Sequence, residues 1–254
     1  MMRPRVSTAI SVLAAVFFLV FAIDGLCGVV LQKQTYMLIP GKGRTRLLQS
    51  WTEYAQGNKV AVYQKNAVFI TDISTNTLIN IIPSRKIYAV NDIDEFIRKI
   101  KKIVEQVKAQ QPYQNNTPNA PLNVTVKNTG EIKNFLGYPS EHVEVYANNK
   151  KVRDLWLTDK LPLSKEINVD KAFEKRAQIE DIFVELSGTK DVEATPEYKA
   201  LFKGGKISMM TISYNLGSEE IERVTQVEIT QIPQHIFEVP AGFKKVPIEQ
   251  FMRH

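Results

Sequence analysis

The chain has 254 residues, of which 44% are hydrophobic and 24% are charged, and its formal net charge is +6. This composition excludes a chain that is disordered throughout, because it supplies enough apolar side chains for a buried core. The 33 basic residues are spread along the chain without a basic block, so the sequence does not favour a nucleic-acid partner. A weak attraction to anionic membrane surfaces is the more natural consequence of the charge.

The N-terminal residues have the pattern of an export signal. Arg3 and Arg5 precede an apolar stretch at residues 9–23, which Asp24 and several small residues follow. A basic start, an apolar run of this length and small residues at its end predict a secretory signal peptide over residues 1–28. The alternative is an uncleaved N-terminal anchor, although the run is shorter than the ~20 residues that a spanning helix needs.

Cys27 is the only cysteine of the chain, so no intrachain disulfide can form. Its place at the end of the apolar run raises the alternative of a lipid-modified cysteine. Asp24 and Leu26 before it do not fit such a signal, and we expect Cys27 to be lost with the signal peptide.

Short runs rich in β-branched and aromatic residues follow the signal. Turn residues such as Pro40-Gly41 and Gly57-Asn58 separate them. Turns this close together join antiparallel neighbours, because a parallel crossover needs a dozen or more residues. The sequence therefore predicts a meandering sheet with strands at residues 29–39, 44–54, 60–65, 67–72, 77–82 and 85–90.

The hydrophobic period then changes from that of strands to that of a helix. Asp92 and Glu95 fit a capping box, and Pro112 marks a stop. Between them, apolar residues recur on one face, which predicts an amphipathic helix. This apolar stripe consists of Phe96, Ile97, Ile100, Ile103, Val104 and Val107.

The second half of the chain continues the same domain. Residues near 110–121 are rich in Pro and Asn and predict a mobile loop, because a strand pattern resumes at 122–127. A second helix is predicted near residues 169–186, with Phe173, Ile182 and Phe183 on its apolar side. A third follows Thr195-Pro196, and strands at 206–214 and 220–232 follow that helix. Residues 29–254 thus form one α+β domain, with one antiparallel sheet and helices packed on one face.

The strand at 140–147 carries His142 and Glu144 on one face and Val143 on the other. A His and a Glu two residues apart are too few for a metal site, since three or four ligands are needed and the chain has only 3 histidines. We therefore expect no metal here, a solvated face at His142, and a buried Trp156 on the next strand.

Catalytic and cofactor motifs give no positive signal. The sequence has no Gly-x-Ser-x-Gly elbow, and Gly41-Lys42-Gly43 lacks the spacing of a phosphate-binding loop. We expect a protein without a cofactor and without enzymatic activity.

Four stretches of the chain resemble an exported bacterial family of unknown function. They are "YAQGNKVAVY", "VFITDISTNTLINIIPSRKIYAV", "GEIKNFLGYPSEHVEVYANNKKVRDLWLTDKL" and "FEVPAGFKKV". The resemblance spans nearly the whole mature chain. Many relatives carry a cysteine soon after the Gly-Tyr pair, where this chain has Pro139 and Ser140, so no role of that cysteine can be transferred.

The family is similar in fold to the outer-membrane lipoprotein carriers. The resemblance implies a strongly curved antiparallel sheet, an incomplete barrel, with amphipathic helices packed on its concave face. Relatives of that fold bind acyl chains or sense lipoproteins, which implies a periplasmic or envelope-associated protein whose membrane contact is peripheral or through the N-terminal segment. The stripes of the predicted helices are compatible with an apolar pocket, whose lining would be Phe96, Ile100, Ile103, Val104, Val107, Phe173, Ile182 and Phe183.

Three functions remain open from the sequence, the third of which is a hydrolase, for which no catalytic constellation is found. One is binding of an apolar ligand, a lipid or lipoprotein acyl chain, under a helical lid. The alternative is a non-enzymatic envelope interaction or sensor module with an envelope protein as partner, in which the same side chains simply fill the core.

Overall fold

The computed structural model describes residues 27–39, 44–110, 122–172, 174–175, 177–178, 192–215 and 218–251. The predicted signal peptide, except for its last two residues, lies outside these residues, as does the predicted loop near 110–121 except for Gln110, which is helical. Cys27, the first residue described, is exposed. Within the described ranges, no helix is both long and apolar enough to cross a membrane.

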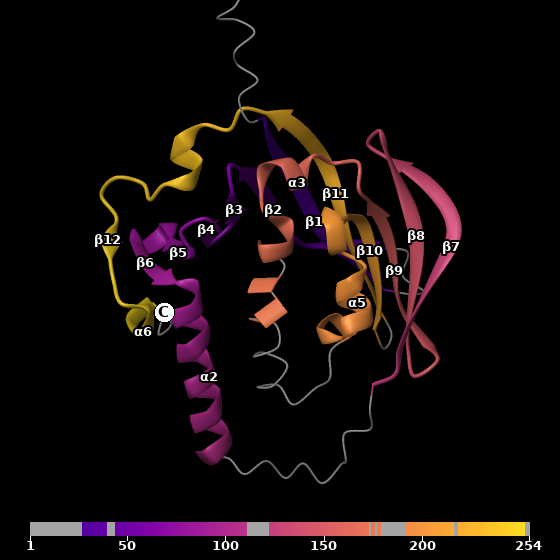
Figure 1. The fold of residues 1–254 in the computed structure, drawn as a ribbon, viewed down its shortest axis with the longest axis horizontal. Helices are drawn as coiled ribbons and strands as arrows, with labels where there is room; N and C mark the ends of the chain where they lie inside the picture. The colour runs from indigo at the N-terminus through magenta and orange to yellow at the C-terminus, as the bar shows by residue number, and fades with distance from the viewer. Residues whose placement is uncertain are drawn as a thin grey trace, which may run out of the picture.

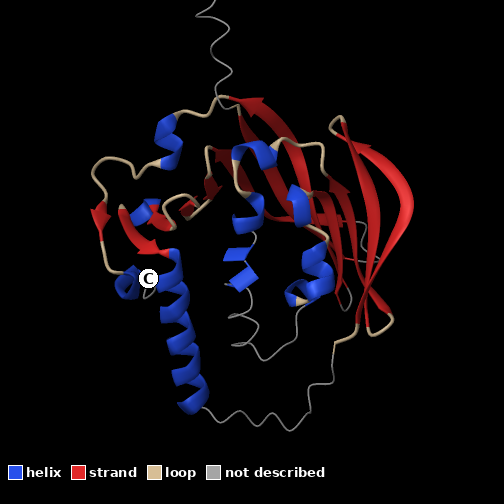
Figure 2. Ribbon diagram, in the orientation of Figure 1, coloured by secondary structure: helices blue, strands red, loops and turns tan. Residues whose placement is uncertain are grey.

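The strands of the described chain form one sheet (Figures 1 and 2). They are β1 (Gly28–Ile39), β2 (Arg44–Gln56), β3 (Lys59–Gln64), β4 (Val68–Asp72), β5 (Thr77–Ile82), β6 (Ile87–Asp92), β7 (Val124–Phe135), β8 (Tyr138–Ala147), β9 (Lys150–Thr158), β10 (Ile207–Asn215), β11 (Ser218–Thr230) and β12 (Lys244–Lys245). Most bounds are close to those predicted, but β7 runs well beyond the predicted 122–127, and β12 was not predicted.

The strand order is β12-β6-β5-β4-β3-β2-β1-β11-β10-β9-β8-β7, so two meanders meet where β1 pairs with β11. The sheet curves strongly around the helices but does not close, because β12 and β7 are its two edges (Figure 1). The predicted α+β class with a curved, incompletely closed sheet is confirmed. One pair departs from the antiparallel pattern, since β12 runs parallel to β6.

Two hairpin turns show why the strands reverse where they do. Gly57 and Asn58 have φ of 58° and 65°, and Asn148 and Asn149 have φ of 50° and 64°. Two-residue hairpin turns with positive φ at both positions match the twist of the flanking strands, and Gly and Asn adopt that conformation most readily.

The longest described helix is α2 (Ile93–Gln110), and Asp92 caps its start by accepting a hydrogen bond from the Glu95 amide at 2.9 Å. The described residues between 169 and 178 are helical, which confirms the start of the second predicted helix. The shorter helices are α3 (Leu163–Glu166), α5 (Pro196–Ala200) and α6 (Ile248–Phe251), with 3-10 turns η1 (Pro83–Arg85), η2 (Val192–Ala194), η3 (Lys203–Gly205) and η4 (Gln234–Phe237).

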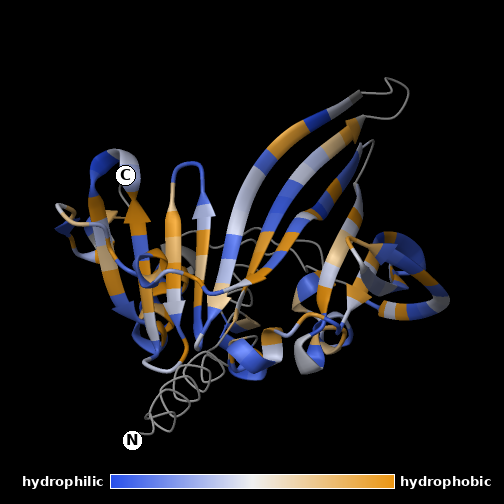
Figure 3. Cartoon of the chain, turned by 90° about the horizontal axis from the view of Figure 1, so that it is seen from above, coloured by the Kyte–Doolittle hydropathy of each residue, from blue (hydrophilic) through white to orange (hydrophobic). Residues whose placement is uncertain are grey.

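Both faces of the sheet carry apolar side chains, and Figure 3 shows hydrophobic residues along strands throughout the sheet. On the concave face, Leu163 of α3 packs with Leu31 and Met209, and Tyr198 of α5 packs with Val145 and Leu155. On the convex face, the C-terminal segment packs against β1 and β3 to β5 through Ile232 and Phe237.

Candidate functional site

One row of side chains crosses the concave face of the first meander, which runs from β1 to β6. Strand pairing places Glu53 opposite Val62, Val62 opposite Phe69, and Phe69 opposite Asn80. Residues directly opposite each other in antiparallel strands share a face. We call these four residues the concave row.

The middle of the concave row is apolar and half-buried. Val62 and Phe69 are half-buried, and neither belongs to the four hydrophobic clusters of the described chain. At one end, Glu53 accepts a hydrogen bond from the Trp51 indole at 2.8 Å and pairs with Lys33 at 3.1 Å. The row therefore offers apolar surface between a charged end and a polar end at Asn80.

Helix α2 makes a small cluster of its own on the same face of the sheet. Ile93, Ile97 and Val104 are buried, and the half-buried side chains that pack against them are Ile100 and Leu78 of β5. Leu78 is the one sheet residue in this cluster among those described. The apolar stripe of α2 is thus attached to the sheet through limited contact.

Of the eight side chains predicted to line a pocket, the structure describes four. Val104 is 1% exposed and Ile103 is 40% exposed, while Phe96 and Ile100 are half-buried. The side chain of Val107 and the residues Phe173, Ile182 and Phe183 lie outside what the structure describes.

Polar contacts hold the second helix beside the start of α2. Lys171 Nζ donates to the carbonyl oxygen of Ile73 at 3.0 Å, and Lys175 forms an ion pair with Asp94 in the first turn of α2. Asn76 also donates to Asp94 at 3.0 Å. These contacts join α2 and the helical segment at 169–178 into one cover, which we call the helical cover.

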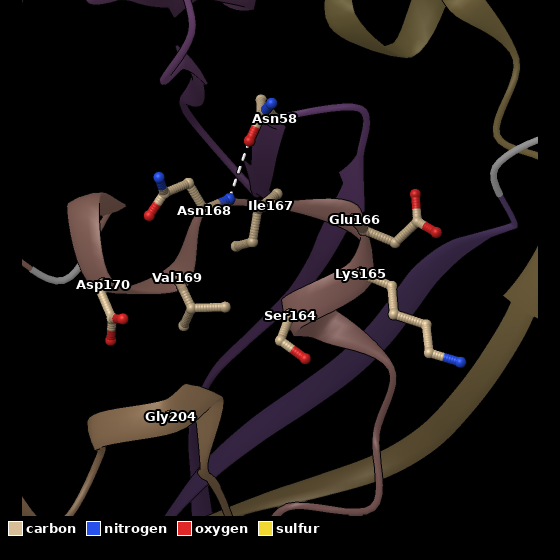
Figure 4. Close-up of a pocket in the computed structure, with 9 residues that line it drawn as sticks. All are labelled: Asn58, Ser164, Lys165, Glu166, Ile167, Asn168, Val169, Asp170 and Gly204. Carbon is tan, nitrogen blue, oxygen red and sulfur yellow. Dashed lines mark hydrogen bonds between the residues drawn. The ribbon is translucent and has the colours of Figure 1, made fainter.

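A hollow of about 420 Å³ opens beside the helical cover, at the β2–β3 turn (Figure 4). Asn58 Oδ1 accepts a hydrogen bond from the Asn168 amide at 2.8 Å on its rim. Figure 4 shows Ile167 and Val169 turned toward the same space. The described lining residues are Asn58, Ser164, Lys165, Glu166, Ile167, Asn168, Val169, Asp170 and Gly204, and they include none of the four predicted residues whose side chains the structure describes.

Asn58 is expected to stabilise the junction between the β2–β3 turn and α3. The backbone N–H of Asn58 also donates a hydrogen bond to the backbone carbonyl oxygen of Glu166 at 2.6 Å. Asn58→Ala should lower the free energy of unfolding by about 1–2 kcal/mol, because it removes the hydrogen bond to Asn168 and strains a positive φ. Asn58→Gly relieves the strain and should cost less in the same urea titration. Equal losses would contradict this assignment.

The region around His142 differs from the prediction. Trp156 is 6% exposed, which confirms that it is buried. The His142 side chain is only 13% exposed, however, so the prediction of a solvated face there is wrong. Its imidazole stacks on Trp156 with ring centroids 4.5 Å apart, and its Nε2 lies 3.0 Å from Asp154 Oδ1. On this convex face, His142, Trp156 and Asp154 bury one another through their own contacts and not through a covering helix.

Asp154 is the centre of this polar network. Burial raises the pKa of Asp154, but hydrogen bonds donated by Tyr214, Lys151 and His142 outweigh burial and hold the pKa below its ordinary value. Burial and the hydrogen bond to Asp154 raise the pKa of Tyr214 to about 12. Lys151 Nζ lies 2.9 Å from Asp154 Oδ2 and 3.4 Å from Glu144 Oε1. The charged and polar groups of this network satisfy one another's hydrogen bonds and stabilise the second meander, which runs from β7 to β11.

The lowered pKa of Asp154 predicts a loss of stability in acid. A carboxyl group with a depressed folded pKa stabilises the fold above its unfolded pKa, and this stabilisation is lost as pH falls through the folded pKa. Asp154→Asn should therefore be less stable than the parent at about pH 6, and the difference should shrink below about pH 4. Urea titrations of the parent and Asp154→Asn, from about pH 6 to below about pH 4, test this prediction. A stability difference between the two proteins that does not change with pH would contradict it.

Among the described residues, no group of three or more His, Cys, Asp or Glu side chains is placed to hold a metal ion. Asp154, His142 and Glu131 converge, but Lys151 and Tyr214 already occupy the second oxygen of Asp154.

Comparison with protein families gives one match. Residues 30–243 match the family described as Domain of unknown function (DUF4412). The chain belongs to this family. The predicted membership of a family of unknown function is thereby confirmed, and no curated protein matches the sequence.

Solved structures with a similar course of the chain are distant in sequence. A structure of PNGF-II has 9% identity and a TM-score of 0.40, and the match covers 89% of this chain but only 32% of that one, so this chain spans about a third of its length. The LolA superfamily protein NE2245 from Nitrosomonas europaea has 6% identity and a TM-score of 0.29, over 84% of this chain and 90% of that one. A DUF1329 family protein from Desulfovibrio piger has 6% identity and a TM-score of 0.29, and the match covers 88% of this chain and 95% of that one. At these values the matches carry no argument about what the DUF4412 chain binds.

Proposed function

We propose that this DUF4412 protein binds the acyl chain of a lipid or lipoprotein between the concave row and the helical cover. The observation that supports the proposal is the separate packing of the two surfaces. The stripe of α2 and the sheet residues beneath α3 and α5 form different clusters, and Val62 and Phe69 are left half-buried outside all of them.

This arrangement favours a ligand over a filled core. Apolar side chains of a close-packed domain usually form one contiguous core with small satellites. A helix whose apolar cluster includes only one described hydrophobic residue of the sheet, Leu78, is instead expected to move away from the sheet at modest cost. An acyl chain against Val62 and Phe69 would remove apolar surface from water at about 25 cal/mol for each Å².

The proposed role is binding without catalysis, in an exported protein of the cell envelope. The support for export is the sequence of residues 1–28. A sensor or interaction module with a protein partner remains the second candidate, because the half-buried apolar residues of the concave row would serve a protein segment as well.

Binding of a fluorescent fatty-acyl probe tests the proposal, with two half-buried valines on opposite faces of the sheet as a matched pair. Val62 lies in the concave row, and Val90 of β6 is opposite Ile79 on the convex face. Val62→Asn should weaken probe binding about tenfold or more, because it places a polar group against the chain, and Val90→Asn should leave it unchanged.

Two results would decide against acyl-chain binding. One is a parent protein that binds no acyl probe at any accessible concentration. The other is an equal loss of affinity in Val62→Asn and Val90→Asn, which would locate the effect in general stability. Either result would favour the interaction module.

Export is expected to be directed by the first 30 residues. A fusion of residues 1–30 to a reporter that is active only outside the cytoplasm should give signal, because these residues have the pattern of a signal peptide. The matched control replaces Arg3 and Arg5 with glutamate and should lower that signal. Activity confined to a cytoplasmic reporter would contradict export.

A further inference from the structure

Two buried amide groups on the concave face have no hydrogen-bond acceptor. The Nδ2 atoms of Asn80 and Asn91 are both buried without a partner, and Asn80 as a whole is 6% exposed. Each of these atoms carries two N–H donors. A buried donor without an acceptor is destabilising, so a pair of them requires an explanation.

The two amides are neighbours and lie beneath the start of the helical cover. Asn80 is opposite Ala89, and Asn91 is opposite Leu78, so the two asparagines are diagonal neighbours on one face of β5 and β6. Leu78 packs against the cluster of α2. Asn80 is also the last residue of the concave row, next to Phe69.

The surroundings of the amides are otherwise suited to apolar residues. Phe69 and Leu78 are half-buried on this face, and Ala89 is 1% exposed. On the convex face of β5, the positions next to Asn80 hold Ile79 and Ile81. Valine or leucine at position 80 would fill the same place without an unsatisfied donor.

We infer that Asn80 and Asn91 donate hydrogen bonds to the carbonyl oxygen of a bound acyl group. This inference rests on the proposed function and extends it to the polar end of the ligand. The acyl chain lies against Phe69 and Val62, and its carbonyl end meets the two amides. The opposite end of the row does not compete for an acceptor, because Glu53 is itself a carboxylate paired with Lys33.

The chemistry of the amides selects among ligands. The unsatisfied atoms are donors, so they favour an oxygen acceptor and offer nothing to an ammonium group. Neutral N–H groups can donate either to the carboxylate of a free fatty acid or to the carbonyl oxygen of an acyl ester. A hydrocarbon without oxygen would leave both donors unsatisfied, and a site with unpaired polar groups discriminates against such an analogue.

Three probes of equal chain length test the inference on the full chain: a fatty acid, its methyl ester and the corresponding alkane, each competing with a fluorescent acyl probe. Asn80→Leu and Asn91→Leu should each weaken binding of the two oxygen-containing probes about tenfold and leave alkane binding unchanged. Both variants should be at least as stable as the parent in urea, because each removes an unsatisfied donor. The control Ile81→Val lies on the convex face and should lower stability without changing any affinity.

The outcomes separate this inference from the proposed function. Binding of all three probes with no effect of Asn80→Leu and Asn91→Leu would overturn the amide site and leave acyl-chain binding standing. Failure of the parent to bind any probe would overturn both. A fatty acid that responds to the variants while its ester does not would assign the donors to a carboxylate, and the reverse would assign them to an ester carbonyl. Should Asn80→Leu fail to fold, Asn91→Leu alone carries the same comparison.

Discussion

Replacing Trp156 with alanine is expected to lower the free energy of unfolding by about 3–5 kcal/mol. Trp156 is 6% exposed, and its indole contacts the imidazole of His142 and the ring of Phe135, with centroids 4.5 and 5.5 Å away. Truncation would leave a cavity lined by rigid strand residues, and strands paired on both sides relax little. Urea denaturation followed by far-UV circular dichroism measures the loss.

Two further variants show which part of the loss comes from the ring. Trp156→Phe keeps an aromatic side chain and should cost about 1–2 kcal/mol. His142→Ala should also cost about 1–2 kcal/mol, since it removes the stacked ring and one partner of Asp154. The double variant with Trp156→Ala should lose less than the sum of both, because the two rings share one contact. A cost near zero for Trp156→Ala would contradict the packing described for β9.

Introducing a charge at Val104 is expected to release α2 from the sheet. Val104 is 1% exposed, and a lysine there would bury an ammonium group without a partner. Because the cluster of α2 is separate from the others, the cheapest response is movement of the helix away from Leu78. Amides of α2 should then exchange with solvent about tenfold faster or more, whereas amides of β8 and β9 should keep their protection. Binding of an acyl probe should weaken by a similar factor.

Ile103→Lys provides the matched control on the same helix. Ile103 is 40% exposed, so its variant should change neither exchange nor probe binding by more than about twofold. If Val104→Lys instead lowered protection equally in α2, β8 and β9, the helix would be part of a single cooperative core. That result would favour the interaction module over a lid.

Much of the fold could be predicted because its signals are local. The turn residues Gly57-Asn58 and Asn148-Asn149 reverse the chain where the strand patterns end, and the stripe of α2 has a helical period. The short strand β12 could not be predicted in the same way. Its two residues, Lys244 and Lys245, pair with β6 only because the chain returns from β11 to the far edge.

The candidate site depends on contacts that no local pattern records. In the sequence, Val62 and Phe69 have the pattern of ordinary strand residues. Only the register across β2 to β5 shows that they lie in one row with Asn80. His142 was predicted to be solvated because alternation assigns it to the face opposite Val143. The face is correct, but alternation does not show that Trp156 and Asp154 lie beside it.

The position of β1 has a consequence for how the chain folds. This first strand lies in the middle of the sheet, and its Gly28 pairs with Thr230 near the end of the chain. The meander from β1 to β6 can form early, but one side of β1 then exposes unpaired amides and carbonyls until β11 arrives. Pairings between such distant residues slow folding, and open strand edges promote association between chains. We therefore expect closure of the β1–β11 seam to be the slow step, during which the half-formed sheet is most prone to aggregate.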